Sequence, residues 1–140
     1  MLKKIIFTIL LVFFTFGVSL NASAADRWQW INSSDAESVY LDTQTITYDY
    51  GYSTSKSTKP VGATAWVKFF EPNINKATLL QNYFSFINNT ITGYSYAIYI
   101  DDKLEDSGTI PSYSRKEEPI IPGSFGEDVK RALMRRAGIY

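Results

Sequence analysis

The sequence predicts an α+β domain: an antiparallel sheet of about six strands, with one C-terminal amphipathic helix packed on one face. Two observations predict this fold. Segments in which apolar and polar residues alternate fill most of the chain after residue 25, and the convincing helical periodicity comes last. A run of strands followed by a single helix is typical of a sheet with its helix on one side.

The N-terminal segment has the three parts of a secretory signal peptide. Lys3 and Lys4 form a positive end, residues 5–18 carry no charge, and Ala22-Ser23-Ala24 has the small side chains that signal peptidase accepts. The uncharged run is short for a transmembrane helix. We therefore expect a cleaved signal peptide, with an uncleaved anchor helix as the alternative.

Cleavage after Ala24, or after the neighbouring Ala25, divides the chain into two parts. Residues 1–24 are the expected signal peptide, and residues 25–140 are one exported α+β domain that does not span a membrane. The predicted location is the periplasm or the cell surface of a bacterium, and the sequence leaves both open.

Strand-like segments occupy the first half of the expected domain. Trp28 and Trp30 alternate with polar neighbours, and a Thr- and Tyr-rich run follows later, as strands prefer. A Ser-, Thr- and Lys-rich stretch at 51–62 predicts a hairpin loop. The expected strands are 27–31, 39–41, 45–50 and 63–70.

The centre of the chain carries the strongest strand signal. Residues 79–87 and 91–100 flank Asn88-Asn89-Thr90, which predicts a tight turn between two long strands. In the second run, Gly93, Ser95, Ala97 and Tyr99 share one face, and this small-residue face predicts close packing against a helix. A turn at Asp101-Asp102-Lys103 then leads into a short strand, and 112–121 is expected to be an ordered loop.

The expected helix begins after Ser124. Ser124 and Glu127 form an S-x-x-E capping box, in which each side chain accepts from a backbone N–H that the helix leaves unpaired. Asp128 and Arg131 are spaced to pair on the outer side. Residues at helical spacing form one apolar face: Phe125, Val129, Ala132 and Leu133.

Composition excludes several classes of function. The chain has no histidine and no cysteine, so it lacks an imidazole base, a thiol nucleophile, a disulfide and the nitrogen or sulfur ligands of zinc and copper sites. Without Lys3 and Lys4, 12 basic residues stand against 14 acidic ones, a net charge of −2. We therefore expect neither an enzyme nor a nucleic-acid-binding protein, and no cofactor or metal.

Four carboxylates between residues 101 and 106 raise one alternative, because oxygen ligands of this kind bind calcium. The spacing of Asp101, Asp102, Glu105 and Asp106 does not match a D-x-D-x-D-G calcium loop. Acidic residues also favour turns, where they accept hydrogen bonds from their own backbone. A hairpin tip is the preferred interpretation, and calcium binding stays open.

Three tyrosines form the candidate binding face. Tyr48, Tyr50 and Tyr52 alternate along an expected strand, next to the predicted loop. Rows of exposed aromatic side chains are typical of contact surfaces. Burial in the core is the alternative for each of them.

Several segments together resemble a known family. They follow a tryptophan-containing strand just after the expected signal peptide, and they are 38–46 (SVYLDTQTI), 65–68 (AWVK) and 121–127 (IPGSFGE). In order and spacing the chain resembles the surface-adhesin protein E-like family of small exported proteins of Gram-negative bacteria. This resemblance implies an antiparallel sheet with a C-terminal helix, and adhesive binding of host matrix or serum proteins. Familiar members carry cysteines near the middle and the C-terminus, which this chain lacks.

The predicted function is that of a non-enzymatic protein of the cell envelope or surface, which binds a host or matrix protein or a glycan. The alternative is a soluble periplasmic accessory or structural domain with no host ligand. The sequence does not distinguish the ligand or the oligomeric state.

Overall fold

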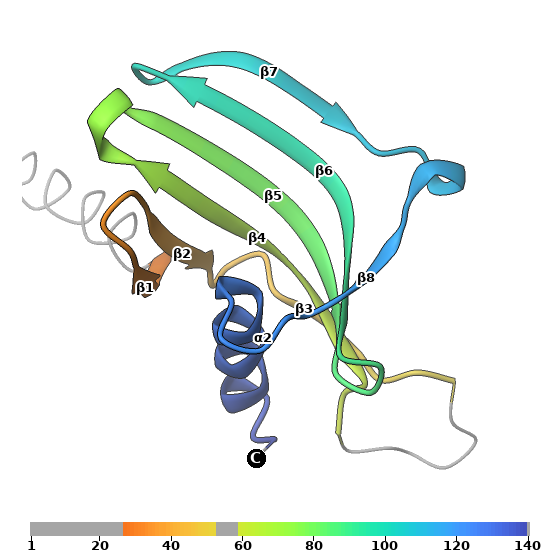
Figure 1. Ribbon diagram of the computed structural model, residues 1–140. Helices are drawn as coiled ribbons and strands as arrows, with labels where there is room; N and C mark the ends of the chain where they lie inside the picture. Colours follow the sequence, from red (N-terminus) through yellow and green to blue (C-terminus); the bar gives the residue numbers. More distant parts are fainter. Residues whose placement is uncertain (1–26, 53–58, 140) are drawn as a thin grey trace, which may run out of the picture.

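The computed structural model describes residues 27–52 and 59–139 (Figure 1). The expected signal peptide, residues 1–24, and its cleavage site lie outside the described residues. Strands come first and the helix last, so the predicted α+β class is confirmed. The described strands are β1 (Trp28–Ser33), β2 (Ser38–Asp42), β3 (Thr47–Asp49), β4 (Gly62–Glu71), β5 (Lys76–Ser85), β6 (Thr90–Ile100), β7 (Lys103–Thr109) and β8 (Glu117–Pro119).

All strand pairs are antiparallel and belong to one sheet with the order β1-β2-β4-β5-β6-β7. The short strands β3 and β8 extend it, because β3 pairs with the start of β4 and β8 with the start of β6. A turn between β5 and β6 is present as predicted, but it covers residues 86–89 instead of 88–90, with Asn89 at a positive φ of 56°. The turn between β6 and β7 places Asp101 and Asp102 at φ values of 49° and 61°, a conformation that aspartate tolerates better than most residues.

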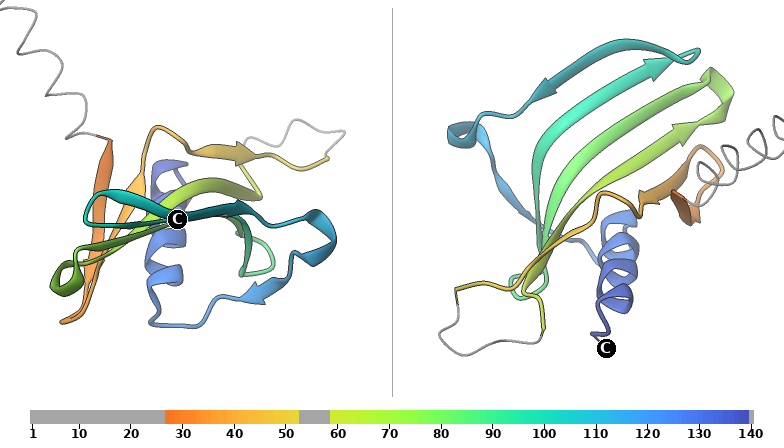
Figure 2. Two further views of the ribbon diagram at one scale, coloured as in Figure 1. Left: turned by 90° about the horizontal axis from the view of Figure 1, so that it is seen from above. Right: turned by 180° about the vertical axis from the view of Figure 1, so that it is seen from behind.

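The helix α2 (Phe125–Arg136) crosses one face of the sheet (Figure 2). Ser124 is its N-cap and accepts from the Glu127 N–H, while the Glu127 carboxylate accepts from the Gly123 N–H at 2.8 Å. The Ser124 half of the predicted capping box is thus confirmed, whereas the Glu127 carboxylate binds the N–H of Gly123, one residue before the N-cap, instead of that of Ser124. The expected Asp128–Arg131 pair is wrong: Asp128 accepts from Asn32 Nδ2 at 2.8 Å, and Arg131 lies 3.5 Å from Glu127.

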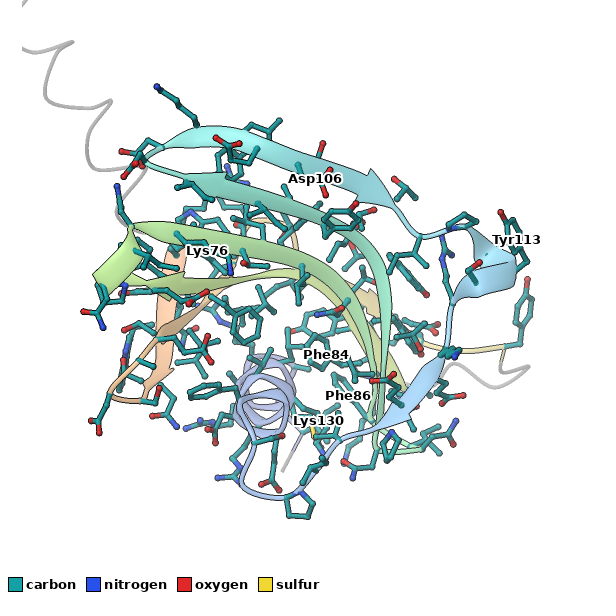
Figure 3. The ribbon with its side chains drawn as sticks, turned by 45° about the horizontal axis from the view of Figure 1, so that its top comes forward. Lys76, Phe84, Phe86, Asp106, Tyr113 and Lys130 are labelled. Atoms are coloured by element: carbon teal, nitrogen blue, oxygen red, sulfur yellow. The ribbon has the colours of Figure 1, made fainter. Side chains whose placement is uncertain are left out.

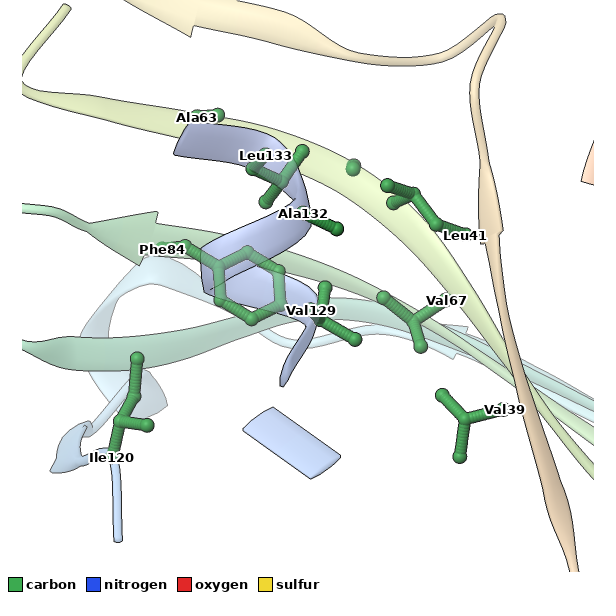
Figure 4. Close-up of a cluster of buried hydrophobic side chains, with 10 residues drawn as sticks. Val39, Leu41, Ala63, Val67, Phe84, Ile120, Val129, Ala132 and Leu133 are labelled. Carbon is green, nitrogen blue, oxygen red and sulfur yellow. The ribbon is translucent and has the colours of Figure 1, made fainter. Parts of the chain in front are cut away.

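The hydrophobic core lies between α2 and one half of the sheet (Figure 4). Val129, Ala132 and Leu133, three of the four residues predicted for the apolar helix face, are buried, and Phe125 is partly buried against the same cluster. The sheet side of the core comes from β2, β4 and β5, and its members are Val39, Leu41, Ala63, Ala65, Val67 and Phe84. Figure 3 shows the strands curving over the helix, with Phe84 on the inner side.

A β-bulge in β6 changes which residues share a face. Gln81 pairs with Ser95 and Asn82 with Gly93, so Tyr94 is an extra residue without a partner on β5. The expected small-residue face is therefore divided, and the prediction that it packs against the helix is wrong. Ala97 and Tyr99 instead line a small hollow with Trp28 and Trp66, on the side of the sheet away from α2.

Two further expectations need correction. The segment 112–121 is more than a loop, because it contains a turn of 3₁₀ helix (Ser112–Ser114), strand β8 and the buried Ile120. The strand expected over 45–50 is shorter, because β3 ends at Asp49 and Gly51 has a φ of 65° that turns the chain.

Candidate functional site

A groove of about 680 Å³ lies on the helix side of the sheet, next to the first turn of α2. Strands β4 to β6 form its floor, the segment from Ile110 to Glu118 forms one wall, and the start of α2 forms the other. Its volume falls in the range of small-molecule binding sites, roughly 300 to 1,000 Å³. Its apolar lining consists of Phe69, Leu80, Ile91, Tyr96, Ile110 and Phe125.

Local sequence explains why the groove stays open. Gly93 lies on its floor, where a Cβ atom would be 3.1 Å from Ile110 Cδ1 and 3.6 Å from Asn82 Oδ1. A side chain at this position would therefore occupy the space between floor and wall. Phe69 and Phe125 meet edge to face, with ring centroids 6.4 Å apart, and fix the start of the helix against β4.

Asn82 is the unusual residue of the groove. It is only 7 % exposed, and its side-chain amide has no hydrogen-bond partner among the described residues. In the part of the chain that the structure describes, no polar side-chain atom is both sealed from solvent and unpaired. The Asn82 amide must therefore open into the groove that it lines. A buried amide without a protein partner is costly, and it is available to donate to and accept from a ligand.

Charged side chains lie along one wall of the groove. Arg115 and Lys116 are positive and Glu118 is negative. The Arg115 Nε donates to the Ile110 carbonyl at 3.0 Å, and the guanidinium lies 4.4 Å from the centroid of the Tyr94 ring. These contacts position Arg115, while its terminal nitrogens have no partner among the residues described.

The first turn of α2 also lines the groove, through Ser124, Phe125 and Gly126. The N–H groups of Glu127 and Asp128 are capped by Ser124. The N–H groups of Phe125 and Gly126 have no acceptor within residues 27–52 and 59–139. Unpaired N–H groups at the start of a helix carry partial positive charge and favour anions.

The structure separates the three tyrosines of the candidate binding face. Tyr48 is half-buried against the core and donates to the Leu133 carbonyl at 3.1 Å, and burial raises the pKa of its phenol. Tyr50 is 50 % exposed and Tyr52 is fully exposed, beyond the end of β3. They therefore do not form one strand face. Binding by Tyr50 and Tyr52 stays a prediction.

The acidic residues at 101–106 are spread along a hairpin. Asp101 accepts from Asn75 Nδ2 at 3.1 Å, and Asp106 accepts from the Tyr96 hydroxyl at 3.2 Å. In the described ranges no three carboxylates gather as a metal site would require.

The face of the sheet away from α2 is rich in aromatic rings and cations. The Lys68 ammonium lies 4.6 Å from the Trp28 ring centroid and 4.7 Å from that of Tyr40, and burial lowers its pKa. Nearby, Arg27 binds the fully buried Asp42 through both carboxylate oxygens, and this hydrogen bonding raises the pKa of the guanidinium. These cations are engaged within the domain.

Sequence reasoning missed the groove, because its residues come from segments far apart in the chain. Two signals were present: a glycine inside a long strand, which often marks a bulge or a close approach, and an asparagine, a residue that strands disfavour, inside a long strand-like run. Only the pairing of Asn82 with Gly93 reveals that they belong together.

Comparisons with known proteins identify no relative: no family model, no curated protein and no solved structure matches the chain. Within residues 27–52 and 59–139, no helix has the length and hydropathy to cross a membrane.

Proposed function

We propose that this chain is an exported, non-enzymatic binding protein of the bacterial cell envelope, and that the groove beside α2 is its ligand site. One observation carries the proposal: the Asn82 amide, in a side chain that is 7 % exposed, opens into the groove without a protein partner. Folding leaves the hydrogen-bonding capacity of this amide unused, and a bound ligand would satisfy it.

The groove residues support binding rather than catalysis. Glu118 is the one carboxylate among them, and the chain has no histidine or cysteine to act as base or nucleophile. Export rests on the N-terminal pattern of charge, apolar run and small residues. Mass spectrometry of the protein purified from a bacterial envelope tests it, since cleavage after Ala24 or Ala25 is expected.

Binding is tested with N-phenyl-1-naphthylamine, a neutral probe that fluoresces in apolar sites. We expect the mature domain to bind it with one-to-one stoichiometry, and Gly93→Val to reduce the affinity at least tenfold because the new side chain fills the groove. The matched control is Ser107→Val on β7, an exposed site outside the groove. Far-UV circular dichroism verifies that both variants fold. Equal binding by folded wild-type and Gly93→Val proteins would contradict the proposed site.

A second function is favoured by the exposure of Tyr50 and Tyr52. Exposed tyrosines are common in protein contact surfaces, and the family resemblance implies adhesion to host proteins. The double variant Tyr50→Ser/Tyr52→Ser should then lose binding to an immobilised host matrix protein, while its unfolding curve stays unchanged. No binding by the wild-type domain would leave the groove as the functional site.

A further inference from the structure

We infer that the ligand of the groove is an anionic amphiphile, with an apolar tail along β5 and β6 and a carboxylate or phosphate head at the wall formed by Arg115. This inference rests on the proposed function and adds the chemistry of the ligand. It combines three features of the same groove: an apolar floor, a positive wall and an unpartnered buried amide.

The apolar part of the groove selects a hydrocarbon tail. Leu80 and Ile91 on the floor and Ile110 on the wall are only partly buried by the protein itself. A tail that covers them removes apolar surface from water, which is worth about fourfold in affinity for each buried methylene. Ligands with longer tails should therefore bind more tightly until the groove is full.

The head group is selected by positive charge. Arg115 is held by the Ile110 carbonyl and the Tyr94 ring, so its free terminal nitrogens need little ordering to bind an anion. Lys116 adds a second positive charge, and the unpaired N–H groups of Phe125 and Gly126 lie across the groove.

The negative groups near the groove are mostly engaged elsewhere. Glu127 accepts from the Gly123 N–H and Asp128 from Asn32, while Glu117 accepts from Thr90 and Asn88. Glu118 alone among the lining residues opposes an anion, so the lining charge is +1. A cationic head group would be repelled by Arg115 and Lys116, and a neutral head group would form no ion pair with either of them.

The experiment measures displacement of N-phenyl-1-naphthylamine from the mature domain by four compounds below their critical micelle concentrations. They are dodecanoate, dodecyl phosphate, 1-dodecanol and dodecyltrimethylammonium, with inorganic phosphate as a tail-free control. We expect the two anions to bind at least tenfold more tightly than the alcohol and the cation, and inorganic phosphate not to displace the probe. The stronger of the two anions identifies the head group.

Variants then test whether the preference for anions comes from the groove wall that contains Arg115. Arg115→Gln should weaken binding of both anions about tenfold more than it weakens binding of 1-dodecanol and of the neutral probe. The matched control Lys103→Gln, at the exposed start of β7 and outside the groove, should change none of them. One-to-one binding of the probe by the Arg115 variant shows that its groove is still formed.

The outcomes separate the two proposals. If the probe binds, Gly93→Val weakens its binding at least tenfold, and anions show no advantage over the alcohol, the head-group inference is wrong and the groove remains the proposed binding site. If anions are preferred but Arg115→Gln has no effect, the inference is also wrong. If Gly93→Val does not affect the probe, both proposals fail.

Discussion

The side of the sheet that faces α2 has two halves with opposite character, and β5 runs through both. Under the helix, Phe84 is 1 % exposed and packs with Leu41, Val67 and Leu133, none of which is more than 1 % exposed. Two residues away, Asn82 opens into the groove, and Leu80 beyond it is only half-buried. The same strand thus contributes to the core and to the candidate site.

Length explains the difference. A helix of 12 residues spans about 18 Å, whereas a strand of 10 residues spans about 33 Å. One helix of this size cannot cover a sheet built on β4, β5 and β6, as Figures 1 and 2 show. Part of the apolar face of the sheet is therefore not covered by α2. The segment from Ile110 to Glu118 borders this uncovered part and makes it a groove.

The largest expected effect is the difference between two side-chain truncations, one in each half of the sheet side that faces α2. Leu41→Ala removes a fully buried side chain and should lower the free energy of unfolding by about 3 kcal/mol. Leu80→Ala, in the groove, should lower it by about 1 kcal/mol, because its side chain already meets solvent. Urea denaturation of the mature domain measures both. Equal losses would mean that the two halves are packed alike, contrary to the comparison.

Smaller effects are expected from two buried polar residues of β5. Substituting them should change the free energy of unfolding in opposite directions. Ser85 accepts from the Asn88 N–H at 3.1 Å, so Ser85→Ala should cost about 1 kcal/mol. Asn82 has no such partner, and Asn82→Leu should raise the free energy of unfolding by about 1 kcal/mol. If Asn82→Leu destabilises the folded domain as much as Ser85→Ala does, the amide is structural and the proposed site loses its main support.

The smallest expected effect on stability at neutral pH comes from substituting Tyr83. This residue lies between Asn82 and Phe84 in β5, on the opposite face of the sheet. Burial, followed by the hydrogen bond to Asp49 at 3.0 Å, raises the pKa of Tyr83 to about 12. An unfolded tyrosine ionises near pH 10. The folded state therefore keeps the phenol proton up to a higher pH than the unfolded state does. The contribution of this pKa difference to the free energy of unfolding is complete below about pH 10 and is lost as the pH rises toward 12.

Absorbance at 295 nm in an alkaline titration measures this ionisation. Tyr83→Phe should remove a transition near pH 12, and Asp49→Asn should move that transition to lower pH, because the nearby negative charge is gone and a neutral amide accepts the hydrogen bond more weakly. The matched control is Tyr113→Phe, which changes an exposed ring on the segment after β7 (Figure 3). Loss of the same transition in the control would assign it to the wrong residue.

Elements that depend on neighbouring residues could be predicted from the sequence. The β5–β6 hairpin follows from two strand-like runs around Asn88 and Asn89, and α2 follows from its capping box and the spacing of Val129, Ala132 and Leu133. The bulge at Tyr94 and the strand β8 could not be predicted, because both depend on pairing with partners elsewhere in the sheet.

The sequence by itself determined the fold class, the single C-terminal helix and the lack of imidazole and thiol chemistry, since these depend on composition and local periodicity. Tertiary structure alone decided where the groove, the candidate site, is formed. Asn82, Gly93, Arg115 and Phe125 are far apart along the chain, and they meet because the sheet is longer than the helix that covers it. Burial also separated the tyrosines: Tyr48 joined the core while Tyr50 and Tyr52 remained exposed, because β3 ends before them.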